Sequence, residues 1–109
     1  MNEINISCNY LKYPINKENL KLFCKEILNY KGYTDYLVSI IFVSQEELKK
    51  MKKKYFKKDM YTDIIAFNLN QENEDLEGEL YVSYNYVKHN SKSYKTNFEE
   101  ELRRVITHG

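Results

Sequence analysis

The sequence predicts an α+β fold in which a mixed four-stranded sheet, with one antiparallel strand, packs against helices. Alternating and helical apolar patterns follow one another in the order βαβαββαα. The first two connections carry helices and require parallel pairing, whereas the third is too short for a crossover and must join antiparallel neighbours. A chain of 109 residues with three Gly and one Pro has room for a single domain, residues 1–109.

The N-terminal part predicts a strand followed by a helix. Residues 3–10 alternate, which is typical of a half-buried strand with Ile4, Ile6, Cys8 and Tyr10 on one face. Pro14 and Asn16 mark the start of a helix, and Gly32 suits its C-terminal end. The apolar positions of this helix recur at helical spacing: Leu20, Phe23, Cys24, Ile27 and Leu28.

The middle of the chain predicts a central strand and a narrow amphipathic helix. Residues 36–43 are almost continuously apolar and predict a strand buried on both faces. Ser44 and Glu47 form a capping box. The helix that follows has the apolar stripe Leu48, Met51 and Tyr55.

The last part predicts two strands and two helices. Residues 62–69 and 78–84 are the strands, and the polar, acidic residues 70–77 join them. Ser83 caps a helix that directs Tyr86, Val87, Asn90 and Tyr94 inward, and Thr96 with Glu99 opens the final helix, whose apolar stripe is Phe98, Leu102, Val105 and Ile106. We expect one core, made by Leu37, Ile40, Ile41, Val43, Ile65 and Phe67 against Phe23, Ile27 and Leu102.

Composition favours a cytoplasmic protein. The chain has no apolar run long enough for a membrane span and no signal peptide at Met1, so we expect no membrane association. Cys8 and Cys24 belong to no CxxC pair and are expected to be reduced thiols. The net charge of +1 gives no overall attraction for polyanions, so the local distribution of charge matters.

A dense lysine run is the first candidate for a binding surface. Seven of the ten residues 49–58 are lysines: Lys49, Lys50, Lys52, Lys53, Lys54, Lys57 and Lys58. Such a cluster neutralises phosphates, although a solvated helix face is an equally good interpretation. Tyr55, Phe56 and Tyr61 lie within or beside the run and could stack on unpaired bases, whereas at helical spacing Tyr55 also fits a core.

Two dipeptides and one histidine are further candidates. Thr62–Asp63 and Gly78–Glu79 stand at the starts of strands, where they could line a cleft or serve as ordinary turn residues. His108 borders the apolar stripe of the last helix. Taken alone it is better explained as a helix-terminal histidine than as a zinc ligand, because a catalytic zinc needs three protein ligands. His89 is expected to be exposed on its helix.

Three blocks in order resemble the YbeY family of metal-dependent endoribonucleases, which are bacterial rRNA maturation factors. They are Tyr61-Thr62-Asp63-Ile64-Ile65-Ala66-Phe67, then Gly78-Glu79-Leu80-Tyr81-Val82-Ser83, then Glu101-Leu102 leading to His108-Gly109. Phe56 stands where many relatives carry an arginine, so no arginine role is transferred to it. The last block corresponds to the first histidine of a His-Gly-x-x-His-x-x-Gly-x-Asp-His motif, so the chain resembles a member truncated at its C-terminus.

The resemblance implies a zinc-dependent, single-strand-specific endoribonuclease that matures the 3′ end of 16S rRNA and serves ribosome quality control. It implies one Zn²⁺ per intact protein, with His108 as a ligand, and Thr62, Asp63, Gly78 and Glu79 as cleft-lining residues. The implied partners are rRNA and the small ribosomal subunit, with no DNA, and the protein is expected to be a monomer. Residues 1–109 alone are expected to be inactive. The alternatives are a non-catalytic RNA- or ribosome-binding module that uses the lysine run, and a protein-interaction domain that uses the sheet edge.

Overall fold

The computed structural model describes residues 2–8, 15–33, 35–68 and 76–108, without the side chains of Phe98 and His108. The strands are β1 (Asn2–Cys8), β2 (Tyr36–Val43), β3 (Ile64–Asn68) and β4 (Leu76–Ser83). The helices are α1 (Lys17–Tyr30), α2 (Gln45–Phe56), α3 (Tyr84–Ser93) and α4 (Phe98–His108). None of the helices in these ranges is both long and apolar enough to cross a bilayer.

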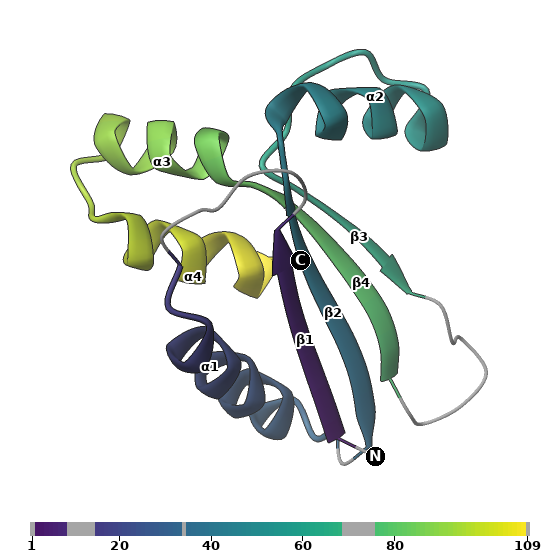
Figure 1. The fold of residues 1–109 in the computed structure, drawn as a ribbon, viewed down its shortest axis with the longest axis vertical. Helices are drawn as coiled ribbons and strands as arrows, with labels where there is room; N and C mark the ends of the chain where they lie inside the picture. Colours follow the sequence, from purple (N-terminus) through teal and green to yellow (C-terminus); the bar gives the residue numbers. More distant parts are fainter. Residues whose placement is uncertain (1, 9–14, 34, 69–75, 109) are drawn as a thin grey trace.

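The four strands form one mixed sheet in the order β1-β2-β4-β3. β2 pairs in parallel with β1 and β4, and β3 pairs antiparallel with β4, so the predicted α+β architecture is confirmed. Helices α1, α3 and α4 lie on one side of the sheet, and α2 lies apart from them near one end of the sheet (Figure 1). Three parts of the prediction lie outside the described residues. They are the extension of the first strand to Tyr10, the helix signal at Pro14, and the acidic residues 70–75.

The apolar side chains divide into two clusters instead of the single expected core. Because strand side chains alternate between faces, Val38, Ile40 and Phe42 of β2 share one face with Val82 of β4. They pack against α1, α3 and α4, and the buried helix residues are Leu20, Cys24, Leu28, Tyr84, Val87, Leu102, Val105 and Ile106.

The second cluster lies on the opposite face. Val43 and Ile65 are buried there against Leu48 of α2, with Ile41 and Phe67 partly buried beside them. The prediction that Ile41, Val43, Ile65 and Phe67 pack against Phe23, Ile27 and Leu102 was therefore wrong. The register of the strands turns these side chains toward α2, and the side chains of Phe23 and Ile27 are only half-buried.

The burial of β2 also differs from the prediction, because of the same alternation. Its residues alternate between buried and half-buried along most of the strand, because α2 covers only part of the second face. The predicted burial of both faces was wrong at Leu37, which is half-buried.

Helix caps form largely as the sequence predicts. The Ser44 hydroxyl accepts from the Glu47 N–H at 3.1 Å, and the Ser83 hydroxyl accepts from the Tyr86 N–H at 3.2 Å. Gly32, with φ of +88°, follows α1, and its N–H donates to the Asn29 carbonyl at 3.0 Å. α2 ends differently, because Lys57 takes the left-handed conformation with φ of 56° and its N–H donates to Lys53.

Two predictions for the last helices were wrong. The Asn97 side chain, and not Thr96, caps α4: its carbonyl oxygen accepts from the Glu100 N–H at 2.8 Å, and its amide donates to the Glu100 carboxylate at 3.1 Å. A capping residue accepts from the N–H three positions ahead, which places the start one residue later than the Thr96–Glu99 pair suggests. Tyr94 follows the end of α3 and is 64% exposed instead of facing inward.

Candidate nucleic-acid interface

The seven lysines of residues 49–58, here called the lysine surface, belong to α2 and to the two residues that follow it. Lys50, Lys53, Lys54, Lys57 and Lys58 are exposed, and Lys49 and Lys52 are half-buried. Within the described part of the chain, Lys49 alone among the seven forms an ion pair, with Asp59 at 3.7 Å. Most of this positive charge is therefore available to an external anion.

Four aromatic rings, here called the aromatic cluster, lie beside the lysine surface: Tyr55, Phe56, Phe67 and Tyr81. The Phe67 ring of β3 stacks on Phe56, with centroids 6.1 Å apart and planes inclined at 28°. It also makes edge contacts with Tyr55 at 5.2 Å and Tyr81 at 5.9 Å. Three elements, α2, β3 and β4, thus join at Phe67.

Tyr55 and Phe56 are 54% and 43% exposed. The interpretation of Tyr55 as a core residue was therefore wrong: the buried residue of α2 is Leu48, which lies about two turns before Tyr55 at 3.6 residues per turn. The aromatic cluster therefore lies at the surface, and Phe67 and Tyr81 pack behind its two exposed rings.

Glu79 reaches this face through Tyr81. Burial raises the pKa of the Tyr81 hydroxyl, and the charge of Glu79 and a hydrogen bond to it act in the same direction. Since Glu79 and Tyr81 alternate with Gly78 and Leu80 along β4, their side chains lie on the α2 face of the sheet. Glu79 is therefore placed beside the aromatic cluster.

Thr62 and Asp63 lie at the other end of the β3–β4 pair. They precede β3, and the Asp63 carbonyl accepts from the Ser83 N–H at 3.0 Å. The register pairs Ile64 with Val82 and Asn68 with Gly78, so the two dipeptides are separated by roughly 13 Å of strand at about 3.3 Å per residue. The structure does not bring the four predicted cleft residues together.

Gly78 belongs to a groove on the α1 side of the sheet. This groove of about 280 Å³ is mainly apolar, and its lining includes Cys24, Ile27, Gly78, Leu80 and Ile106. A Cβ atom on Gly78 would lie 3.2 Å from the Phe67 carbonyl oxygen, so β3 approaches β4 closely here. Burial raises the pKa of the Cys24 thiol to about 11, which makes that thiol unreactive at neutral pH.

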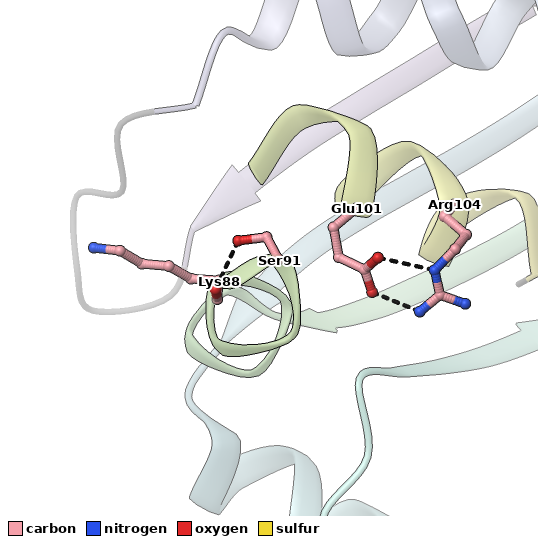
Figure 2. Close-up of polar contacts among 4 residues, drawn as sticks. All are labelled: Lys88, Ser91, Glu101 and Arg104. Carbon is pink, nitrogen blue, oxygen red and sulfur yellow. Dashed lines mark hydrogen bonds and ion pairs between the residues drawn. The ribbon is translucent and has the colours of Figure 1, made fainter. Parts of the chain in front are cut away.

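An ion pair between a buried carboxylate and a half-exposed arginine, which the sequence did not reveal, lies on α4. Glu101 is 2% exposed, and Arg104 donates to its carboxylate through Nε at 2.9 Å and through a second nitrogen, as Figure 2 shows. These hydrogen bonds lower the pKa of Glu101 against the opposing effect of burial. They also raise the pKa of Arg104, to which Asp63 contributes through its charge. Nearby on α3, the buried Ser91 donates to the Lys88 carbonyl at 2.7 Å.

The described residues do not make a metal site by themselves. His108 is the last residue of α4, and its side chain is not among the described atoms; His89 on α3 is exposed, as predicted. No group of three or more His, Cys, Asp or Glu in the described part of the chain could hold a metal ion. The fit to zinc is therefore incomplete within these residues.

These features define an α+β domain with a basic, aromatic surface at one end of a mixed sheet. The chain belongs to the YbeY family: the family model described as Endoribonuclease YbeY matches residues 5–109. The resemblance inferred from the three sequence blocks is thereby confirmed.

Individual relatives and one solved structure agree with this assignment. The Endoribonuclease YbeY of Christiangramia forsetii is 43% identical over 72 residues, covering 66% of this chain and 50% of the relative. That of Thermotoga sp. (strain RQ2) is 37% identical over 92 residues, covering 84% and 59%, and that of Borreliella afzelii is 31% identical over 112 residues, covering 93% and 74%. A solution structure from Thermotoga maritima superimposes with a TM-score of 0.68 at 31% identity, covering 98% of this chain and 69% of that one. The chain thus spans between half and three-fifths of the length of the first two relatives.

Proposed function

We propose that this chain is the RNA-binding part of a zinc-dependent, single-strand-specific endoribonuclease. Its substrate is rRNA of the small ribosomal subunit, where it acts as a cytoplasmic monomer in maturation of the 16S rRNA 3′ end and in ribosome quality control. The observation that carries this proposal is the lysine surface. Its seven lysines lie on one short helix and directly after it, and in the described residues one of them forms an ion pair with an acid of the chain.

Physical chemistry supports RNA as the ligand of the lysine surface. Each lysine that contacts a phosphate releases a condensed counterion, and affinity built in this way depends steeply on salt. Because the whole molecule carries a net charge of only +1, the attraction is directed to one face. The names of the relatives, Endoribonuclease YbeY, support RNA rather than DNA and support cleavage rather than binding alone.

Zinc enters the proposal through His108. The family resemblance implies three histidine ligands, and this chain contains two histidines, of which His108 stands at the first motif position. We propose that His108 binds Zn²⁺ together with histidines four and ten positions further along in a longer chain. Residues 1–109 alone are then expected to be inactive as a nuclease.

A second function is favoured by the same surface. A non-catalytic RNA- or ribosome-binding module would need the lysine surface and the fold but no metal. The two functions differ in what they predict for a chain that carries the complete histidine set. The enzyme would cleave RNA, whereas the binding module would not.

The test of RNA binding replaces Lys52, Lys53, Lys57 and Lys58 by Gln. We expect weaker binding of single-stranded RNA and a smaller slope of log K against log salt concentration. Each lost phosphate contact should reduce the magnitude of that slope by about 0.7. The measurement is fluorescence anisotropy of a labelled oligoribonucleotide across a series of salt concentrations.

The matched control makes the same change of charge elsewhere. Lys17, Lys21 and Lys25 of α1 and Lys92 of α3 are exposed, and their replacement by Gln should leave the salt slope as it is. If the two quadruple variants lose affinity and slope equally, RNA binding is not localised on α2 and the proposal is wrong.

A further inference from the structure

Three exposed aromatic rings on and just after α2 each have a lysine ammonium over the ring. Lys52 Nζ lies 4.8 Å from the centroid of Phe56, Lys54 Nζ 5.2 Å from that of Tyr55, and Lys49 Nζ 4.5 Å from that of Tyr61. Tyr61 is 43% exposed, as is Phe56. Large apolar side chains gathered on one exposed face indicate an interaction site.

Phe56 has the most rigid support of the three. The Phe67 ring stacks beneath it, and Tyr55 and Tyr81 hold Phe67 at its edges. The Tyr81 side chain is in turn hydrogen-bonded to Glu79. A ring fixed from behind by sheet residues offers a planar surface that loses little side-chain entropy on binding.

We propose that Phe56, supported by Phe67, is a stacking platform for an unpaired RNA base. Lys52, which lies next to this ring, then contacts the adjacent phosphate. This inference rests on the proposed RNA-binding function and specifies where the bases lie.

Two physical reasons favour this occupant. Single-stranded RNA alternates planar bases with negative phosphates, which matches rings alternating with ammonium groups. An exposed cation–π contact is weaker than stacking of a base on a ring, so a base displaces Lys52 from Phe56 and frees the ammonium for a phosphate. A duplex would keep its bases stacked on one another, so the platform favours single strands.

The test compares two oligonucleotides with the same phosphates. One is a short single-stranded oligoribonucleotide that includes 2-aminopurine, whose fluorescence falls when it stacks, and the other is abasic at every position. We expect the full protein to bind the base-bearing strand at least fivefold more tightly than the abasic one and to quench 2-aminopurine. Chelator is present, so that no metal-dependent cleavage interferes.

The variant Phe56→Leu keeps apolar bulk and removes the π face. It should reduce the preference for the base-bearing strand at least fivefold and abolish quenching, while the salt slope stays unchanged because no phosphate contact is removed. Phe56→Tyr should retain both properties. The matched control is Tyr30→Leu, since Tyr30 is 92% exposed at the end of α1, away from the lysine surface.

The outcomes separate this inference from the function on which it rests. Equal binding of both strands by the unmodified protein, with a steep salt slope, overturns the platform and leaves RNA binding by the lysine surface intact. An unchanged base preference in Phe56→Leu also overturns the platform. Absence of binding to either strand overturns both.

Discussion

At the scale of single residues, Glu101 shows how context changes the role of a side chain. Its position in the first turn of α4 suggests an exposed acid that interacts favourably with the helix dipole. Instead it is 2% exposed, and among the described residues the bidentate contact from Arg104 compensates its loss of hydration. Arg104 also lies over the Tyr94 ring at 5.8 Å, which joins the turn after α3 to α4.

Removal of this partner should destabilise the fold in a pH-dependent way. Arg104→Gln should cost about 2 kcal/mol at pH 7, less than the roughly 3–5 kcal/mol of a fully buried pair, because the Arg104 side chain is 48% exposed. The pKa of Glu101 is lowered in the folded state, so the pair contributes above the ordinary pKa of about 4.3 and its contribution is lost as pH falls through the lowered value.

Denaturant unfolding at pH 7 and at pH 3 measures this effect. The difference in free energy of unfolding between the unmodified chain and Arg104→Gln should be largest at pH 7 and should shrink at pH 3. Arg103→Gln is the control, since Arg103 contacts the Phe23 ring and no carboxylate among the described residues. A difference that does not vary with pH would mean that Arg104 stabilises the fold through packing.

At the scale of elements, α2 buries fewer residues than any other helix in the described part of the chain. Leu48 is its one buried residue, whereas α1 buries Leu20, Cys24 and Leu28. Leu48→Ala should lower stability by about 2–5 kcal/mol. It should also increase amide hydrogen exchange in α2 more than in α1 and weaken RNA binding although every lysine remains.

The control for this prediction is Leu20→Ala, which deletes the same atoms on the opposite face. We expect a comparable loss of stability without selective exchange in α2. Equal exchange of both helices in Leu48→Ala would indicate that α2 and the sheet open only together.

Sequence patterns predicted the elements better than their environments. Ser44 and Ser83 could be identified as caps because a hydroxyl three residues before a helical N–H is a local signal. The division into two clusters could not be predicted, since it depends on β4 pairing between β2 and β3 and on the register that turns Ile65 toward α2. The separation of Thr62–Asp63 from Gly78–Glu79 has the same origin.

The candidate site divides in the same manner. The lysine run is visible in the sequence because charge density requires no tertiary information. The support of Phe56 by Phe67 is not visible, because the two rings are eleven residues apart and meet only when α2 packs against β3. The proposed stacking surface depends on tertiary contacts of this kind, which a solvated helix lacks.

At the scale of the whole molecule, the two faces of the sheet have different properties. One side carries the helices of the main cluster and an apolar groove that extends to Ile106 near the end of α4. The other carries α2, the lysine surface and the aromatic cluster. The proposed zinc ligand, His108, is the last residue of α4, and α4 lies on the side of the sheet that carries the main cluster.

Ligand number determines the expected metal binding. A single imidazole cannot offset the dehydration of zinc, so residues 1–109 should retain little zinc after dialysis and should not cleave RNA above background. A chain extended by histidines four and ten positions after His108 should hold about one zinc and gain nuclease activity, and His108→Ala should remove both. Stoichiometric zinc in the short chain, measured by atomic absorption, would contradict this expectation.

At the end of α2, the left-handed conformation of Lys57 sets thermal stability against RNA binding. A lysine with φ of 56° bears a steric cost that glycine would avoid, so selection for thermal robustness alone would favour glycine there. In the proposed function, Lys57 also attracts RNA phosphate. Directed evolution for heat resistance should therefore exchange Lys57 early and lose affinity as it does so, whereas Lys95, with the same φ of 56° in the turn before α4, should be free to change.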